Sequence, residues 1–212
     1  MILVDLTQVL RNGMPVYPGT EGPRLEIGCS IEKDGFEEKR ITMFSHTGTH
    51  MDAPAHLIYG APTLDALPVS AFYGKAVLYR HPDGGTETIS LRDLGPVMEA
   101  VGSADFLVIR TGWSRFWGQE RYYAGFPTLT TEAAARLAST RLKGVALDCI
   151  SADRADTVDY EVHKLLLGRG MVIVENLTGL DALPGTFGLS CFPLKIESAD
   201  GSPVRAVAYV ED

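Results

Sequence analysis

The sequence predicts a single α/β domain, residues 1–212, built on a mixed, barrel-like β-sheet with packed helices. Three observations support this fold class. Strand candidates outnumber helix candidates, and in the second half of the chain the helices lie between strands. Several strands, such as Phe106–Ile109 and Met171–Val174, are continuously apolar, which indicates a sheet covered on both faces. We find no internal repeat and no linker-like change in composition, so one domain is the simplest interpretation.

The strand candidates are distributed along the whole chain. In order, they are Ile2–Leu6, Leu25–Ile31, Lys39–Phe44, Ala76–Tyr79, Phe106–Arg110, Val145–Cys149, Met171–Val174, Phe192–Ile196 and Val204–Val210. Two long loops between them, Pro15–Pro23 and Gly112–Pro127, are rich in aromatic residues. Loops of this length often serve binding.

The helix candidates are fewer: Leu91–Val101, Thr130–Ser139 and Tyr160–Arg169. The first is interrupted by Gly95-Pro96, which opposes a continuous helix. In the second, Thr130 is expected to cap the N-terminus, ahead of an alanine run of high helix propensity. The third is expected to begin after Asp159 as its N-cap and to stop at the glycines that follow it.

The composition is that of a globular protein for which polyanions are not expected to be the main partners. Hydrophobic residues make up 45% and charged residues 22% of the chain, which is ordinary for a folded domain. The net charge of −8 disfavours nucleic acid and anionic membranes as partners. The sequence has neither a P-loop nor a GxGxxG motif after a strand, which disfavours a nucleotide-binding enzyme.

The three cysteines, Cys29, Cys149 and Cys191, are widely spaced and form no CxxC pair. A disulfide framework or a cysteine zinc site is therefore not expected, and buried free thiols indicate a cytoplasmic location. The N-terminus lacks the features of a signal peptide, and no apolar run approaches the ~20 residues of a membrane-spanning helix.

Histidine and aspartate are concentrated in one short segment. Ser45–His56 contains His46, His50, Asp52 and His56, which are three of the five histidines and one carboxylate. Imidazole and carboxylate together are the ligands of zinc, manganese or iron at hydrolytic centres. The segment therefore predicts a metal site.

The local sequence opposes a helix here, because β-branched threonines flank Gly48 and Pro54 ends regular structure. In an extended chain the four candidate residues share one parity and face one side. At ~3.3 Å per residue, His46 and His50 would then lie about 13 Å apart, too far for one ion. Either the chain bends near Gly48 or the ligands serve two ions, and both can hold.

Two more candidates lie downstream. His163 is expected on the first turn of the third helix, and Glu175 at the carboxyl end of an apolar strand. Ligand sites in open α/β sheets lie at such strand ends, and a buried acid there needs a cationic partner. The structural alternatives are an exposed helix residue for His163 and a salt bridge to an arginine for Glu175.

The segment His46-Thr47-Gly48-Thr49-His50-Met51-Asp52-Ala53-Pro54-Ala55-His56 resembles the HxGTHxDxPxH signature of the cyclase-like metal-dependent hydrolases, which include bacterial kynurenine formamidase (arylformamidase) and isatin hydrolase. Shorter stretches resemble other family motifs in the right order. They are Asp5-Leu6-Thr7, Pro15–Gly19, Arg110–Trp113, Asp148–Ser151, His163–Leu166, Val174–Leu177, Pro193–Ile196 and Gly201–Ala206.

The resemblance implies a single domain of the swivelling β/α/β type, with a barrel-like sheet, that assembles as a homodimer or homotetramer. It also implies zinc or manganese, with two ions per subunit, and a small-molecule substrate. His46, His50, Asp52, His163 and Glu175 would be the metal ligands, with Asp52 bridging the ions. His56 would be the catalytic acid/base and not a ligand.

The resemblance departs at one position that bears on substrate. The kynurenine formamidase branch has Trp-Pro-Gly-Asp in the N-terminal loop, where this chain has Tyr17-Pro18-Gly19-Thr20. Tyr17 is therefore the best substrate-binding candidate, and kynurenine formamidase itself is less expected than metal-dependent hydrolysis in general. The other aromatic candidates for the pocket are Phe44, Tyr59, Trp113, Trp117 and Phe126, of which Phe44 and Trp117 are expected to pack in the core.

The function predicted from these residues is hydrolysis of a small amide, formamide or cyclic amide or ester by metal-activated water. Histidine is well suited to moving protons near neutral pH, which gives His56 its expected role. Two other interpretations stay open at this point. One is a metal-binding protein without catalysis; the other is an oxidoreductase with mononuclear iron on a two-histidine, one-carboxylate triad.

Overall fold

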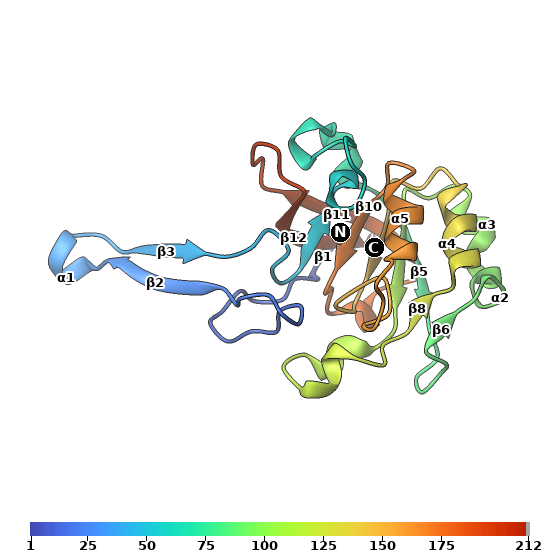
Figure 1. The fold of residues 1–212 in the computed structure, drawn as a ribbon, viewed down its shortest axis with the longest axis horizontal. Helices are drawn as coiled ribbons and strands as arrows, with labels where there is room; N and C mark the ends of the chain where they lie inside the picture. Colours follow the sequence, from blue (N-terminus) through green and yellow to red (C-terminus); the bar gives the residue numbers. More distant parts are fainter. Residues whose placement is uncertain (211–212) are drawn as a thin grey trace.

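A closed β-barrel forms the body of the protein in the computed structural model, which describes residues 1–210 (Figure 1). Its sheet has the strand order β1-β12-β11-β5-β7-β9-β10-β4, and a further pairing of β12 with β4 closes it. The strands of this sheet are β1 Ile2–Asp5, β4 His50–Asp52, β5 Tyr73–Arg80, β7 Phe106–Arg110, β9 Gly144–Leu147, β10 Val172–Glu175, β11 Thr186–Pro193 and β12 Gly201–Val210. Neighbours from β5 to β10 are parallel, whereas the others are antiparallel, so the expected mixed, barrel-like sheet is confirmed.

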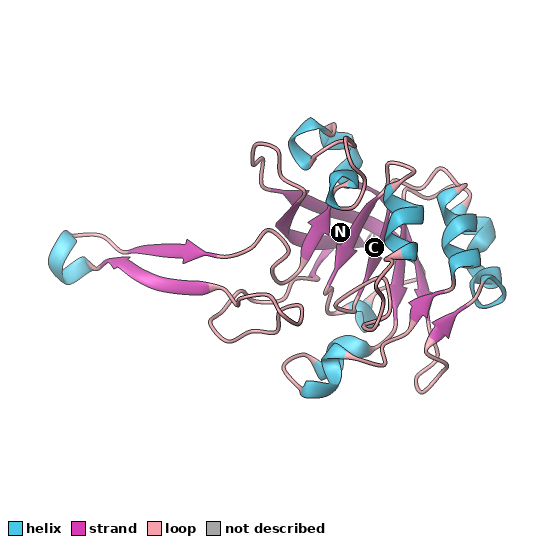
Figure 2. Cartoon of the chain, in the orientation of Figure 1, coloured by secondary structure: helices cyan, strands magenta, loops and turns pink. Residues whose placement is uncertain are grey.

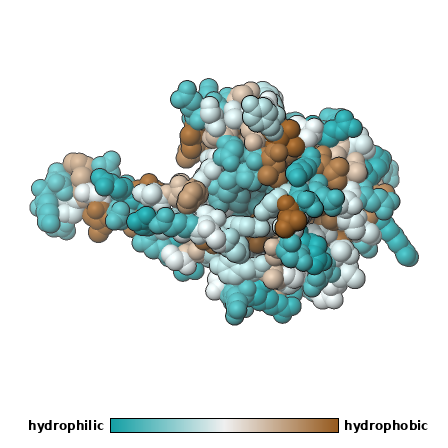
Figure 3. Space-filling model, viewed as in Figure 1, coloured by the Kyte–Doolittle hydropathy of each residue, from teal (hydrophilic) through white to brown (hydrophobic). Residues whose placement is uncertain are grey.

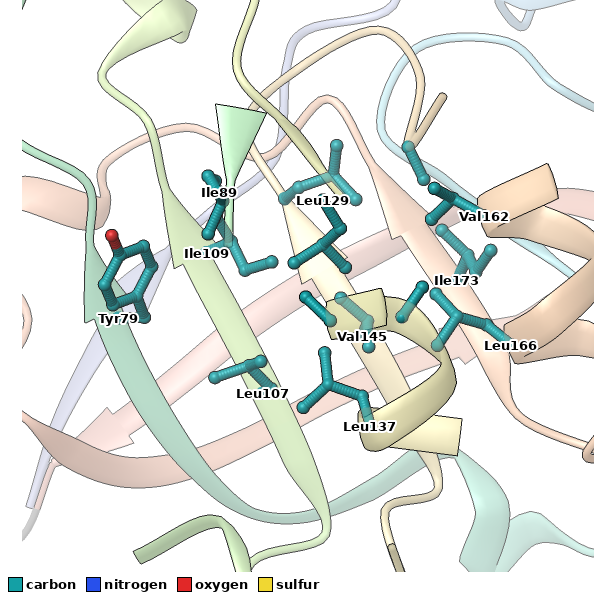
Figure 4. Packing of buried hydrophobic residues seen from close by; sticks show 14 of the residues in the cluster. Tyr79, Ile89, Leu107, Ile109, Leu129, Leu137, Val145, Val162, Leu166 and Ile173 are labelled. Atoms are coloured by element: carbon teal, nitrogen blue, oxygen red, sulfur yellow. The ribbon is translucent and has the colours of Figure 1, made fainter. Parts of the chain in front are cut away.

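Both faces of the parallel strands are buried. Leu107, Val145 and Ile173 point outward and pack under the helices, against residues such as Leu137 and Leu166 (Figure 4). The alternate residues of the same strands join a second apolar cluster on the opposite face, which fills the barrel. Covering a sheet on both faces requires the continuously apolar strands that the sequence contains. Each large side chain buried in this way stabilises the fold by about 1.5–3 kcal/mol.

The helices are α1 Ile31–Asp34, α2 Leu91–Leu94, α3 Met98–Val101, α4 Thr131–Ala138 and α5 Glu161–Leu167. All except α1 pack on the outside of the parallel strands (Figure 2). Thr130 caps α4 as expected, because its side chain accepts a hydrogen bond from the backbone N–H of Ala133. The predicted break at Gly95-Pro96 is also present, as a 3-10 turn between α2 and α3. The other 3-10 turns are Pro54–His56, Leu64–Ala66, Val69–Phe72, Trp113–Phe116, Glu120–Tyr123 and Leu180–Ala182.

The N-cap predicted for α5 is wrong. The capping residue is Tyr160, in the left-handed region with φ 51°, and not Asp159. The first-turn amides of Val162 and His163 donate instead to the carboxylate of Asp153, at 2.9 Å each. The side chain of Asp153, in the preceding loop, therefore caps the helix in place of Asp159.

Several strands differ from the prediction. The short strands β4, β6 Thr88–Ile89 and β8 Thr128–Leu129 were not among the strand candidates. β11 begins six residues earlier than the predicted Phe192–Ile196. The missed part of β11 includes Gly188, which has low strand propensity. A Cβ there would lie 1.7 Å from the ring of Tyr209, so glycine is needed for the two strands to pair at this point.

A two-stranded arm projects from the body (Figure 1). It consists of β2 Arg24–Cys29 and β3 Glu38–Thr42, joined at the tip by α1, and it forms a sheet of its own. A second small sheet pairs β6 Thr88–Ile89 with β8 Thr128–Leu129. In residues 1–210, no helix combines the length and apolar character that crossing a bilayer requires.

Candidate metal centre

Strand pairing brings three of the candidate ligands together: His50, Asp52 and Glu175. β4 carries His50 and Asp52, and it pairs antiparallel with β10 so that Glu175 lies opposite His50. The Nε2 atom of His50 is 3.5 Å from Oε2 of Glu175 and 3.3 Å from Oδ1 of Asp52. Residues 125 positions apart in sequence thus meet because two short strands are adjacent.

A bend at Gly48 adds His46 to this group. Gly48 has φ +68°, which L-residues rarely adopt, and a Cβ there would lie 2.8 Å from Cδ2 of Leu10. The bend returns the chain on itself, so the ring centroids of His46 and His50 are 5.1 Å apart instead of the extended-chain distance. The predicted bend near Gly48 is confirmed.

The last candidate comes from the first turn of α5, as expected. The Nε2 atom of His163 lies 3.2 Å from Oε1 of Glu175 and 3.6 Å from Oδ2 of Asp52. On the other side, Oδ1 of Asp52 lies 2.7 Å from Nδ1 of His46. The two oxygens of Asp52 therefore face two different groups of donors.

These groups have the dimensions of metal sites. One contains His46, His50 and Asp52, and the other contains Asp52, His163 and Glu175, with the donor atoms of each group within 4.8 Å of one another. Imidazole nitrogens with carboxylate oxygens are the donors that zinc and manganese accept. The residues present therefore fit the predicted metals.

The other nitrogen of each of these rings has a fixed partner. Nδ1 of His50 is 2.8 Å from the carbonyl oxygen of Gly48, and Nδ1 of His163 is 2.6 Å from Oδ2 of Asp153. Nε2 of His46 is 2.9 Å from Oδ2 of Asp200. A carboxylate or carbonyl behind the ring is the usual arrangement for metal-binding histidine, because it sets the tautomer and the ring orientation.

The electrostatics of the cluster favour positive charge. Burial would raise the pKa of Asp52, but hydrogen bonds with three histidines, His163 foremost, lower it well below its usual value. Burial would likewise lower the pKa of His163, yet Asp153, Asp52 and Glu175 raise it well above its usual value. Buried carboxylates at this density need cations.

His56 belongs to neither of these two groups, although its ring forms a third set of potential metal donors with His46 and Asp200, within 4.8 Å of one another. It ends the 3-10 turn Pro54–His56, and its ring centroid is 4.0 Å from that of His46 and 6.4 Å from that of His163. Its Nδ1 atom lies 3.1 Å from Oδ2 of Asp200, and its side chain is partly exposed in the cavity wall.

Comparison with known proteins shows which family the chain belongs to. Residues 4–154 match the family model described as "Putative cyclase". The chain belongs to the cyclase family. It is 30% identical to the kynurenine formamidase of Bacillus cereus over 206 residues, which cover 96% of this chain and 95% of that protein. It is also 30% identical to the kynurenine formamidase of Paracidovorax citrulli, covering 97% and 95%.

Solved structures of similar proteins share the whole fold of this cyclase-family chain. Isatin hydrolase A from Labrenzia aggregata superposes with a TM-score of 0.91 at 27% identity, covering 100% of this chain and 94% of the other. A protein described as a predicted metal-dependent hydrolase from Bacillus stearothermophilus gives a TM-score of 0.81 at 27% identity, covering 98% and 97%. The chain is thus a metal-dependent hydrolase for C–N bonds other than peptide bonds. This confirms the hydrolase prediction over the two competing interpretations.

A cavity of about 420 Å³ opens above the cluster of this cyclase-family protein. Its walls include Tyr17, Phe44, Leu57, Ile150 and Tyr160. All five residues of the two donor groups also reach it, as do Gly48 and Asp200 behind the rings. Burial foremost, together with the hydrogen bond to Tyr160, raises the pKa of Tyr17 to about 12, so this hydroxyl is neutral at physiological pH.

The other aromatic candidates divide differently from the prediction. Phe44 lines the cavity and is 55% exposed, so its expected core role is wrong. Trp117 packs against the core, as expected. Trp113 and Phe126 are buried in the core, and Tyr59 lies fully in solvent, so none of these three lines the cavity.

Three residues of the site were not predicted: Asp153, Asp200 and Asn176. Asn176 has φ 60°, donates from Nδ2 to the carbonyl of Gly48 and accepts the hydroxyl of Tyr122. Its signal in the sequence was its position directly after Glu175, within the stretch Val174–Leu177 that resembles a family motif. Asp153 and Asp200 carry no local signal, because their histidine partners are 10 and 144 or more positions away.

Proposed function

We propose that this protein hydrolyses a small amide, formamide or cyclic amide or ester, using two zinc or manganese ions per subunit. The ligands would be His46, His50 and Asp52 on one side and Asp52, His163 and Glu175 on the other. The observation that carries the proposal is the placement of Asp52, whose two oxygens face separate donor groups. A carboxylate in that position is suited to bridging two cations.

Metal ions held there would supply an acidified water and a polarised substrate carbonyl, because a bound metal lowers the pKa of water from 15.7 to roughly 7. The protein contributes the orientation of the ligands. Gly48, Asp153 and Asp200 hold the three rings from behind, so each ring presents a fixed nitrogen to the cluster. Such preorganisation avoids rearrangement during the reaction.

His56 is the proposed acid/base. Its Nδ1 atom faces Oδ2 of Asp200 at 3.1 Å, and the tautomer that donates Nδ1–H to this carboxylate has Nε2 as a proton acceptor. In this role His56 takes the proton that water loses on attack and delivers it to the leaving nitrogen, or to the leaving oxygen of an ester. Asp200 is a positioning residue, since it fixes the tautomer through its contact with the ring.

The proposed substrate is small and carries an aromatic or apolar group beside the scissile bond. Tyr17, Phe44, Leu57 and Ile150 supply an apolar wall within a cavity of limited volume. Isatin-like lactams are the first candidates. N-formyl aromatic amines are the second candidates. The kynurenine formamidase relatives suggest this class, but this chain has Tyr17 where that branch has tryptophan.

An assay across three substrate classes tests the proposal: isatin-like lactams, N-formyl aromatic amines and small cyclic esters. We expect hydrolysis in at least one class, lost on chelation and restored by zinc or manganese. His56→Ala should retain metal and lose most turnover, whereas Asp52→Ala should lose both. Turnover of every class by chelated enzyme, or full activity of His56→Ala, would contradict the mechanism.

The cellular location of the enzyme is also part of the proposal. Cys29, Cys149 and Cys191 are free thiols, which suits the reducing cytoplasm. The negative net charge supports a protein that binds neither nucleic acid nor membranes. Fractionation of cells producing the full chain tests the location.

We further propose that the subunit acts as a homodimer or homotetramer.

A further inference from the structure

The aromatic loop Gly112–Pro127 does not line the cavity, although its composition predicts a binding role. In the described chain, none of its residues is part of the cavity wall above the metal cluster. The outer surface of the loop is hydrophilic (Figure 3), because charged residues such as Glu120 and Arg121 are exposed there. One of its aromatic side chains, Tyr122, is fully buried and turned toward the site.

Tyr122 is held in place on several sides. Its ring packs edge to face on that of Trp117, with the centroids 5.0 Å apart. The indole N–H of Trp113 donates to the backbone carbonyl of Tyr122 at 3.2 Å. The Tyr122 hydroxyl donates to Oδ1 of Asn176 at 2.7 Å. Burial foremost raises the pKa of Tyr122 well above its usual value, so this hydroxyl keeps its proton and remains a donor.

The side-chain amide of Asn176 connects Tyr122 to the bend at Gly48. Its Nδ2 atom donates to the carbonyl oxygen of Gly48 at 2.8 Å. A flipped amide would place Oδ1 against this oxygen, and two acceptors would then face each other. Without the Tyr122 hydroxyl, Oδ1 would be a buried acceptor that lacks its partner, so the amide would tend to turn away.

The carbonyl of Gly48 in turn sets the tautomer of His50. Nδ1 of His50 lies 2.8 Å from that oxygen, which can only accept a hydrogen bond. The ring hydrogen therefore belongs on Nδ1, and the lone pair on Nε2 faces Asp52 and Glu175. Tyr122, Asn176 and His50 are all buried, and hydrogen bonds between buried groups constrain geometry strongly.

We propose that Tyr122 is a positioning residue for the metal ligand His50, acting through Asn176 and the carbonyl of Gly48. Three hydrogen bonds join a loop outside the cavity to the nitrogen on the far side of the ligating one. Outer partners of this kind fix the orientation of a metal-binding ring and raise metal affinity. This role rests on the proposed coordination of a metal ion by His50.

Zinc titration of the full-length protein, chelated and then reloaded, tests this role. Tyr122→Phe removes the hydroxyl but keeps the ring. We expect the dissociation constant for zinc to rise about 3–10-fold, which is less than for loss of a direct partner of the ligand. Cobalt bound in place of zinc should show shifted visible absorption bands in this variant, because the ligand geometry changes.

The matched control is Tyr123→Phe, which removes a hydroxyl from the next residue of the same 3-10 turn. Within residues 1–210 the hydroxyl of Tyr123 makes no hydrogen bond, so this variant should match the wild type in zinc affinity and in cobalt spectrum. Circular dichroism checks the folding of each variant.

A double-mutant cycle separates positioning from a general loss of stability. Asn176→Gly removes the amide, and glycine tolerates the φ of 60° at this position. Because Tyr122 acts through Asn176, adding Tyr122→Phe to Asn176→Gly should weaken zinc binding no further. Wild-type zinc affinity and cobalt bands in Tyr122→Phe, or additive losses in the cycle, would overturn the role. A wild-type protein that binds no zinc or cobalt would overturn the proposed function as well.

Discussion

The carboxylate of Asp200 holds the imidazole of His56, with Oδ2 3.1 Å from Nδ1. The same oxygen lies 2.9 Å from Nε2 of His46. One side chain therefore orients both a proposed metal ligand and the proposed acid/base. The pKa of Asp200 is consistent with both contacts. Burial would raise this pKa, but hydrogen bonds with His46 and then His56 lower it to about 2.

Asp200→Asn should lower kcat by about 10–100-fold at saturating metal, with a smaller change in KM. The amide can present an N–H to His56 where the carboxylate accepts one, which disfavours the productive tautomer. Metal titration of the same variant reports separately on His46. Ser45→Ala is the control, because Ser45 only donates to the other oxygen of Asp200, at 3.1 Å. An unchanged kcat in Asp200→Asn would remove the positioning role.

Asp153→Asn should weaken metal binding about 10–100-fold. The carboxylate of Asp153 accepts the backbone amides that begin α5 and contacts the ring of His163, so its replacement loosens both the helix start and the ligand. Isothermal titration with zinc measures the affinity. Asp156→Asn, three residues away and paired only with exposed Arg154, should bind zinc like the wild type. Equal losses in both variants would refute a specific role for Asp153.

Gly201→Ala should displace the ring of His46. A Cβ at this position would lie 2.4 Å from Cε1 and 2.6 Å from Nε2 of that ring, closer than van der Waals contact permits. We expect lower metal affinity and lower kcat, measured by titration and by the hydrolysis assay. Gly185→Ala is the matched control, because a Cβ there meets nothing within 4 Å. Normal metal binding by Gly201→Ala would show that the ring of His46 is not held where we place it.

Asp105→Asn should make stability less sensitive to acid. Burial would raise the pKa of Asp105, but the backbone N–H of Lys75 and the ammonium of Lys143 lower it below its usual value. A carboxyl with a lowered folded-state pKa stabilises the protein above the unfolded-state pKa, about 3.9, and this contribution is lost as the pH falls through the folded-state pKa.

Urea unfolding of the wild type and of Asp105→Asn over a range of pH measures the effect. The wild type should exceed the variant in unfolding free energy at pH 7, and the gap should close as the pH falls below about 4. A gap of constant size at every pH would mean that the charge of Asp105 does not contribute.

The sequence was informative where the signal was periodic or local. Apolar runs predicted the strands of the parallel region because both of their faces are buried, and Gly48 predicted the bend because few residues tolerate φ +68°. The six predicted histidine and carboxylate residues do converge around one cavity. Their local segment and strand-end position were enough to select them.

What could not be predicted depends on contacts between distant segments. Asp200 meets His46 and His56 only after β12 pairs with β4. Asp153 replaces Asp159 at the start of α5 because a loop folds back onto the helix, which no local rule anticipates. The strand around Gly188 was missed because glycine has low strand propensity. Glycine is needed there because any side chain would collide with the ring of Tyr209 on the neighbouring strand.

The number of metal ions per subunit, in the wild type and in Asp52→Ala, tests the central claim most directly. We predict two ions in the purified wild-type enzyme by elemental analysis, and loss of both ions together with hydrolysis when the Asp52 carboxylate is removed. An Asp52→Ala variant that keeps two ions and full turnover would contradict a shared carboxylate at the centre of the site.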